Sequence, residues 1–177
     1  MFRFALTATA LVCSALLASI ALAAVPHGTF TDLHGKRCQS LESRQDHGSR
    51  LCPGPAGFAL VVYDSDDRSS VDIVNPKNGL YPLSYWDVVT PGYTSVGQKA
   101  EWLMEKRNGK PVPGALLVRL TRLDTANPGE LIAAARIHHD GACVVFRGDL
   151  ADTATLHAAR KAAANPRAKC LAPLGSD

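Results

Sequence analysis

The sequence predicts an α+β fold, in which one C-terminal α-helix packs on an antiparallel β-sheet of about five to six strands and disulfides staple the chain. Three observations lead to this prediction. Short apolar or alternating segments separated by turn residues occupy residues 58–147, one alanine-rich segment follows them, and four cysteines lie downstream of an apolar leader. Strands joined by tight turns and then a single helix are typical of an antiparallel sheet with a helix on one face.

The first 23 residues are expected to be a signal peptide. Arg3 precedes the uncharged stretch 5–23, which ends in Ala21-Leu22-Ala23 with small residues where a signal peptidase cuts. We therefore expect residues 24–177 to form a single exported domain. The alternative is a transmembrane anchor, because 19 uncharged residues approach the length that spans a bilayer.

The charge balance argues against nucleic acid as a partner. The chain has 19 Lys and Arg against 16 Asp and Glu, a net charge of only +3, and no concentrated basic stripe. We expect no membrane contact after signal cleavage and no cofactor. The partner is expected to be another protein or a small anionic or carbohydrate ligand.

Four cysteines remain once Cys13 leaves with the leader. An even number of cysteines in an exported chain predicts disulfides. Of the three ways to pair them, nearest-neighbour pairing joins Cys38 to Cys52 and Cys143 to Cys170. A zinc site is the alternative, but the chain has no Cys-x-x-Cys motif to begin one.

The strands follow one another along the chain from residue 58. Residues 24–56 are polar and rich in turn formers, and the sequence does not place them. The expected strands are 58–63, 71–73, 101–105, 116–121, 131–138 and 143–147, and a long connection over 75–98 interrupts them. Turns are predicted at 64–68, at 107–110, at Asn127-Pro128-Gly129 and at Asp140-Gly141, the last being a two-residue hairpin loop.

The helix is expected directly after the last strand. Asp149 or Asp152 can cap it, alanine dominates it through Ala164, and Asn165-Pro166 ends it. The apolar sheet face is the natural place for this helix, yet Cys143 has to reach Cys170 beyond the helix. Either the tail wraps around the sheet end or the helix lies on the mixed face, and the sequence leaves both open.

The Asp140-Gly141 hairpin predicts which residues share a face. Directly paired residues point the same way, so one face should be apolar. It comprises Leu131, Ala133, Ala135, Ile137, Val144 and Phe146. The opposite face should hold Arg136, His138, Cys143, Val145 and Arg147, joined by Arg119 if the preceding register is ordinary.

Two candidate binding features follow from the residue types. Clustered guanidinium groups attract carboxylate or phosphate, which makes an anion site of Arg119, Arg136 and Arg147 with His138 one hypothesis; the alternative is that each arginine pairs with a nearby acid. The other feature is an aromatic recognition loop, since aromatic side chains can stack on sugars or grip a protein. It consists of Tyr81, Tyr85, Trp86 and Tyr93, and the alternative is that this loop packs over the core.

Catalytic and metal signatures are weaker, and no catalytic or metal-binding residue is assigned. His138 and His139 are strand neighbours and should diverge. The acids Asp64, Asp66 and Asp67 lack the remainder of a calcium loop. The triplet of Asp46, His47 and a nearby Ser43 or Ser49 lacks a nucleophile elbow.

The cysteine layout resembles that of small uncharacterised exported proteins of Gram-negative bacteria. The residues that carry the resemblance are Cys38, Cys52-Pro53-Gly54-Pro55-Ala56-Gly57-Phe58, Asp67-Arg68, Cys143-Val144-Val145 and Cys170. The resemblance implies a periplasmic address and paired cysteines, and it brings no activity. We therefore expect a non-enzymatic binding or accessory protein. The alternative is a small exported hydrolase or metal-binding enzyme with a histidine-containing site that includes His27, His34 or His47.

Overall fold

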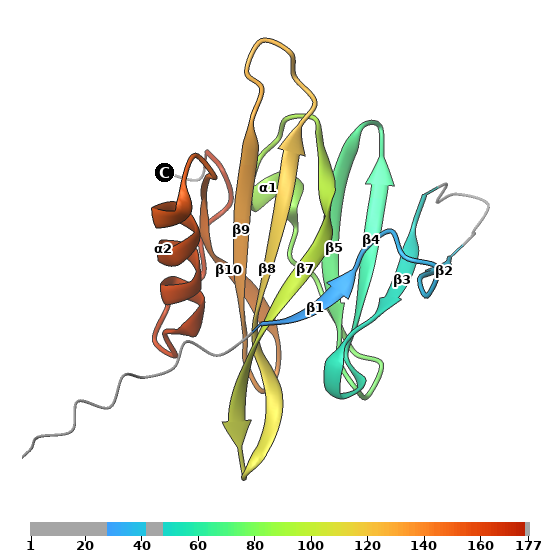
Figure 1. Cartoon of the computed structure of the whole chain (residues 1–177), viewed down its shortest axis with the longest axis vertical. Coiled ribbons are helices and arrows are strands. Elements are labelled where there is room, and N and C mark those ends of the chain that lie inside the picture. The colour runs from blue at the N-terminus through green and yellow to red at the C-terminus, as the bar shows by residue number, and fades with distance from the viewer. Residues whose placement is uncertain (1–27, 42–47, 176–177) are drawn as a thin grey trace, which may run out of the picture.

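A computed structural model describes residues 28–41 and 48–175, and these residues form one ten-stranded sheet with a helix against it (Figure 1). The strands are β1 (Thr29–Asp32), β2 (Gln39–Ser40), β3 (Arg50–Pro53), β4 (Ala59–Ser65), β5 (Arg68–Val74), β6 (Leu80–Tyr81), β7 (Thr94–Arg107), β8 (Lys110–Arg122), β9 (Glu130–Ile137) and β10 (Ala142–Asp149). The helices are the 3₁₀ turn η1 (Pro55–Gly57), α1 (Tyr85–Val88) and α2 (Thr153–Ala164). The expected signal peptide, residues 1–23, lies outside the described residues.

The predicted α+β class is confirmed, but the predicted five to six strands are too few. The additional strands are β1, β2, β3 and β6, each of two to four residues. Segments this short hold at most two residues on each face, so alternation of polar and apolar residues cannot reveal them. Three of them come from the segment that the sequence left unplaced.

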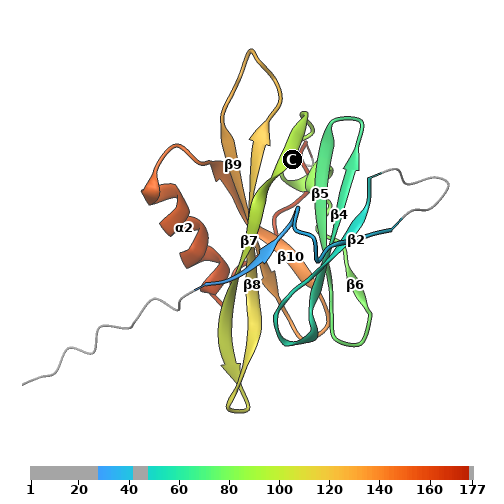
Figure 2. The same cartoon turned by 45° about the vertical axis from the view of Figure 1, so that its right-hand side comes forward.

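The sheet is divided along β7. Its order is β10-β9-β8-β7-β5-β4-β3-β2, and every pairing is antiparallel except a short parallel contact of β5 with β7 at Arg68 and Thr94. β1 pairs with the same edge of β7 as β5 does, but further along the strand, at residues Lys99 to Trp102. β1 therefore occupies the place where the β7–β10 half and the β2–β5 half diverge (Figure 2).

The two sheet faces carry separate apolar clusters. The larger cluster surrounds Trp102 and Tyr85, both fully buried, and includes Ala133, Ala135 and Val144. The smaller cluster lies beneath α2, where Ala159 and Ala163 contact small residues such as Ala115 and Ala134. Because alanines on both sides allow close approach, the helix packs on the mixed face rather than on the fully apolar one.

The C-terminal tail then passes around the edge of β10. The Leu171 N–H donates to the Val144 carbonyl at 2.8 Å, and the Leu174 N–H donates to the Asp87 carbonyl at 2.7 Å. Both alternatives for reaching Cys170 are therefore realised, since the helix covers the mixed face and the tail wraps around the sheet end.

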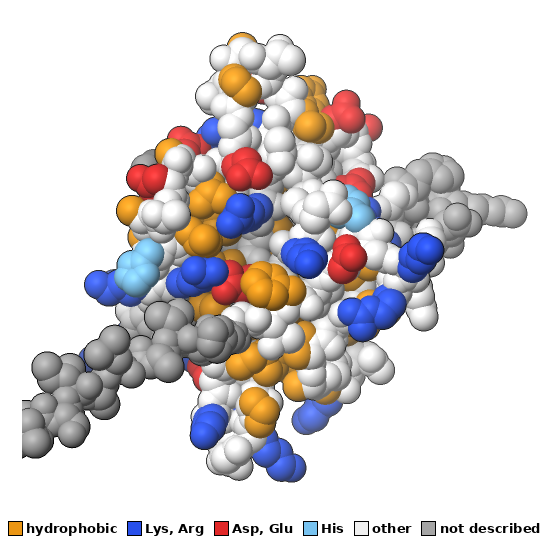
Figure 3. All heavy atoms as spheres, in the orientation of Figure 1, with side chains coloured by type: hydrophobic (Ala, Val, Ile, Leu, Met, Phe, Trp, Pro, Cys, Tyr) orange, Lys and Arg blue, Asp and Glu red, His pale blue; other side chains and the backbone are white. Residues whose placement is uncertain are grey.

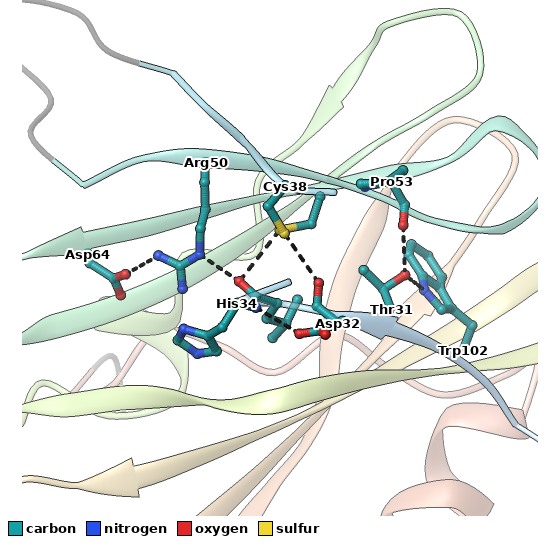
Figure 4. Close-up of a disulfide and its surroundings, with 10 residues drawn as sticks. Thr31, Asp32, His34, Cys38, Arg50, Pro53, Asp64 and Trp102 are labelled. Carbon is teal, nitrogen blue, oxygen red and sulfur yellow. Dashed lines mark hydrogen bonds and ion pairs between the residues drawn. A yellow bond between two sulfur atoms is a disulfide. The ribbon is translucent and has the colours of Figure 1, made fainter. Parts of the chain in front are cut away.

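The predicted disulfides, Cys38–Cys52 and Cys143–Cys170, are confirmed. The first lies beside β1, where Cys38 Sγ is 3.2 Å from the Asp32 carbonyl oxygen (Figure 4). In the same region the Trp102 indole N–H donates to Thr31 Oγ1 at 2.8 Å, and Thr31 Oγ1 donates to the Pro53 carbonyl at 3.2 Å. These bonds fasten β1 between β7 and β3.

The cap of α2 is Asp152, one of the two predicted capping residues. Its carboxylate accepts from the Thr155 N–H at 2.9 Å, and this bond holds the pKa of Asp152 below its ordinary value. The helix ends at Ala164, directly before Asn165-Pro166, as predicted.

The last hairpin departs from prediction at two points. Its loop spans His138 to Gly141, four residues rather than two, with the His138 N–H bonded to the Gly141 carbonyl at 2.8 Å. A bulge between Val144 and Phe146 then shifts the register. Phe146 pairs with Ala134 and Arg147 with Ala133, so these two side chains exchange the faces predicted for them.

Candidate functional site

The three arginines of the predicted anion site do not meet. Arg136 is buried beneath α2, where its Nη2 donates to Glu105 Oε2 at 2.7 Å and its Nη1 to the Ala163 carbonyl at 3.4 Å. The bulge turns Arg147 to the other face, where it donates to the Val88 carbonyl. His138 lies in the loop after β9. Arg119 alone remains exposed, and it shares the Arg136 face as predicted.

Arg119 lies in an open depression on the face that carries α2. The volume of this depression, which we call the α2 depression, is about 370 Å³. Its lining comes from β1, β7, β8, β9 and α2, and comprises Phe30, Gly97, Gln98, Lys99, Glu101, Leu117, Arg119, Glu130, Ile132, Leu156 and Arg160. In the space-filling view, Lys and Arg side chains surround apolar surface on this face (Figure 3).

The floor of the α2 depression is apolar. Leu117 and Ile132 are neighbouring strand residues with exposed fractions of 2% and 1%, and Leu156 of α2 is half-buried. Phe30 of β1 lies at the margin with 54% of its side chain exposed. An apolar floor with an exposed aromatic ring at its edge can accept an apolar group of a ligand.

The rim of the α2 depression carries three cations and two carboxylates. Arg160 makes a two-oxygen contact with Glu101, through Nη2 to Oε2 at 2.9 Å and Nε to Oε1 at 3.1 Å. Arg119 and Glu130 are 4.0 Å apart, and both are about half exposed. Lys99 is exposed, and its ammonium has no hydrogen-bond or ion-pair partner among the described residues. The rim therefore presents a net charge of +1 with one unpaired cation.

Gly97 allows Arg119 to lie where it does. It belongs to the irregular stretch of β7 between Val96 and Ala100, and a Cβ added there would be 3.3 Å from both the Cβ and the carbonyl oxygen of Arg119. A side chain at this position would crowd Arg119, so glycine lets the two strands approach closely without displacing it.

The four aromatic residues of the predicted recognition loop are also dispersed. Tyr85 is fully buried in the core, and Tyr81 Oη accepts from Asn75 Nδ2 at 2.9 Å. Trp86 is half-buried, with the Arg68 guanidinium 5.5 Å from its ring centroid. Tyr93 is 58% exposed. The packing alternative therefore describes Tyr85 and also Tyr81, which packs against the same core, whereas Trp86 lines a separate small pocket.

The other chemical hypotheses find no assembled site. Asp66 and Asp67 form the two-residue tip of the β4–β5 hairpin, and Asp64 pairs with Arg50 and Ser69. His34 Nε2 is 3.3 Å from the Val96 carbonyl oxygen. Within residues 28–41 and 48–175, no three His, Cys, Asp or Glu side chains are grouped as a metal site would need. His27, Ser43, Asp46 and His47 lie outside the described residues.

Of the residues that line the α2 depression, only Arg119 was predicted from the sequence as a site residue, and Phe30, Lys99 and Arg160 are among those that were missed. The alternation Lys99, Ala100, Glu101, Trp102 does place Lys99 and Glu101 on one face of a strand. Nothing in the sequence indicates that β1 pairs with that strand or that α2 crosses above it, so their meeting was not predictable.

Comparisons with known protein families, curated proteins and solved structures find no match for this chain. No helix in the described part of the chain has the length and apolar character needed to cross a membrane.

Proposed function

We propose that this chain is an exported, non-enzymatic binding protein that takes a small anion with an apolar portion in the α2 depression. The observation that carries the proposal is the combination of an unpaired Lys99 with two arginines around an apolar floor. Clustered cations select a carboxylate or phosphate group, and the half-buried Leu156 and the exposed Phe30 ring offer apolar surface to an aliphatic or aromatic portion.

The arrangement of Glu101 favours binding over a purely structural role for the rim. Its contact with Arg160 fixes the guanidinium and uses the donors that face Glu101, while the remaining donors of the fork stay available to a ligand. Preorganised charged groups bind a ligand with a smaller ordering cost than free side chains.

The proposed location is the periplasm or the cell exterior. Two disulfides closed within the fold support an oxidising compartment. The expected leader over residues 1–23 supports the same address.

The experiment is a calorimetric titration of the purified protein with acetate, butyrate, hexanoate and octanoate, with hexyl phosphate as a second anionic head group. We expect saturable binding that strengthens with chain length, by up to about 0.8 kcal/mol for each CH₂ that is buried. We also expect added salt to weaken binding, because the rim charges are exposed to screening. Octanol should bind more weakly than octanoate.

A matched pair of double variants separates the site from overall charge. Lys99→Gln with Arg119→Gln should weaken octanoate binding by about 1.4 kcal/mol, or tenfold. Lys106→Gln with Lys110→Gln removes the same charge at the tip of the β7–β8 hairpin and should leave binding unchanged. Equal losses in both variants, or no binding of any of these anions, would contradict the proposal. Metal-dependent turnover lost on changing His138 or His47 would support the enzyme alternative instead.

A further inference from the structure

A second, smaller pocket lies beside α1 and shares no residue with the α2 depression. Its volume is about 210 Å³, below the roughly 300–1,000 Å³ of sites for drug-sized ligands. We call it the α1 pocket. It is lined by Tyr63, Ser70, Asp72, Pro82, Ser84, Trp86 and Asp87. We propose that the α1 pocket binds a neutral, hydroxyl-rich molecule the size of a single sugar unit.

Asp72 supplies a buried acceptor. Only 9% of the residue is exposed, and its Oδ1 accepts from the Leu83 N–H at 2.9 Å, while the Tyr63 hydroxyl also bonds to the carboxylate. A carboxylate has about four acceptor positions, so these two bonds leave capacity for a ligand. Burial raises the pKa of Asp72 above its ordinary value, because the low-dielectric surroundings disfavour the charge.

Two serines supply hydroxyl groups to the α1 pocket. Ser70 Oγ accepts from the Tyr85 N–H at 3.3 Å, which leaves the Ser70 O–H to donate. Ser84 lies before α1 and makes no capping hydrogen bond through its side chain. Neither the Ser84 hydroxyl nor the exposed Asp87 carboxylate has a hydrogen-bond or ion-pair partner among the described residues.

The backbone at Ser84 is held in an uncommon conformation. Its φ of 49° and ψ of 51° lie in the left-handed region, where glycine is favoured and other residues are strained. Strained residues of this kind cluster at ligand sites. Here the turn brings both Ser84 and Asp87 to the same pocket.

Trp86 provides an aromatic wall that is already oriented. The Arg68 guanidinium lies 5.5 Å from the ring centroid, yet Arg68 is not part of the pocket lining. The part of the indole that borders the pocket is therefore free of the arginine. Together with Tyr63 it offers aromatic surface to the C–H groups of a sugar ring.

The balance of donors and acceptors selects the ligand class. Among the residues that the structure describes, two carboxylates and no cationic side chain line the α1 pocket, so an anion is disfavoured. An ammonium ion would satisfy the carboxylates but would offer nothing to the Ser70 and Ser84 hydroxyl protons. A ligand hydroxyl donates and accepts at once, and therefore satisfies Asp72, Asp87 and both serines.

The test is a two-dimensional amide NMR titration with glucose, galactose, mannose and myo-inositol at millimolar concentrations. The chain has two tryptophans, and a Trp86→Phe variant assigns their indole signals. We expect at least one neutral polyol to shift the Trp86 indole and the amides of residues 82–88 saturably. The Trp102 indole should not move, because it is buried and bonded to Thr31.

Conservative variants at exposed positions complete the experiment. Ser84→Ala and Asp87→Asn should each weaken polyol binding about tenfold, whereas Asp140→Asn, in an exposed loop elsewhere, should not change it. Amide spectra of unchanged dispersion show that each variant is folded. The proposal is overturned if no polyol binds, if both pocket variants bind as tightly as the parent, or if choline binds there in place of the polyols.

Discussion

Arg136 illustrates how a single side chain acquires a role from its neighbours. It was predicted to bind an anion, and it does face one, but the anion is Glu105 of this chain. Only 10% of the Arg136 side chain is exposed, and its Nε atom is buried with no hydrogen-bond partner among the described residues. The folded state therefore depends on the Glu105 carboxylate to offset the cost of burying the Arg136 charge.

We predict that Glu105→Gln lowers the free energy of unfolding by about 3 kcal/mol, because it leaves the Arg136 charge buried without a counter-charge. The measurement is urea unfolding followed by circular dichroism. Glu130→Gln is the matched control, since Glu130 is half exposed and 4.0 Å from Arg119, and its loss should change stability by less than about 1 kcal/mol. Equal effects of the two substitutions would contradict this role of Glu105.

The same carboxylate predicts a pH dependence. Burial raises the pKa of Glu105, but hydrogen bonds from Arg107 and Arg136 outweigh that effect and hold the pKa below its ordinary value of 4.5. A depressed pKa in the folded state means that the ion pair contributes fully above pH 4.5 and is lost as the pH falls through the lower, folded-state value. The parent protein should lose part of its advantage over Glu105→Gln in that acidic range.

Residue types alone predicted some of the side-chain contacts within the chain and not others. Cysteine pairing followed from chain order, and Asp152 was one of two caps that the sequence offered. The separation of Arg136 from Arg147 was not predictable, because one extra residue at Val145 changes the face of everything after it. Bulges depend on packing against other elements, which the sequence pattern does not report.

At the scale of elements, strand length decided what the sequence could reveal. The longer segments with an apolar or alternating pattern appear as β4, β5, β7, β8, β9 and β10, and their bounds differ from prediction only at the ends. β7 and β8 are longer than expected, at 14 and 13 residues. The four short strands escaped detection because hydrogen bonds to neighbours such as β7, rather than their own pattern, hold them in place.

The two residues at the tip of the β4–β5 hairpin are not the ones that its turn type favours. Asp66 and Asp67 have φ values of 49° and 58°, and Ser65 pairs directly with Arg68 around them. A two-residue loop with two positive φ angles is the type I′ turn, which prefers glycine at its second position. Asp67 therefore adopts a conformation that is costly for a residue with a side chain.

We predict that Asp67→Gly raises the free energy of unfolding by about 0.5 kcal/mol, because relief of the left-handed conformation exceeds the entropy that glycine adds to the unfolded chain. Thermal unfolding by differential scanning calorimetry measures the change. Asp140→Gly is the control. Because Asp140 has no positive φ, this substitution should lower the free energy of unfolding or leave it unchanged. A loss of stability in Asp67→Gly would show that the carboxylate itself stabilises the hairpin.

At the scale of the whole molecule, each half of the divided sheet has its own covalent link. Cys38–Cys52 joins the segment after β1 to β3, and Cys143–Cys170 joins β10 to the tail beyond α2. Among the described residues, the hydrogen bonds of the sheet cross between the two halves at the start of β7 and through β1, and the Leu33 N–H adds one more to the Gln98 carbonyl. The loss of one link should therefore be felt mainly in its own half.

We predict that Cys143→Ser with Cys170→Ser lowers the free energy of unfolding by about 3.5 kcal/mol, the loop-entropy value for a separation of 27 residues. For a chain of this size the melting temperature should fall by about 7–14 °C. Limited proteolysis of this variant should cut the tail after α2 first. The helix itself should stay protected, because Arg160 and Arg136 anchor it to Glu101 and β9 through hydrogen bonds that do not depend on the disulfide.

A reductant should lower the melting temperature of this variant further, because it breaks Cys38–Cys52. It should lower the melting temperature of the parent by a larger amount, because the parent loses both disulfides. If reduction leaves the parent's melting temperature unchanged, or if α2 is cleaved as readily as the tail, the two disulfides do not each fasten their own half of the sheet.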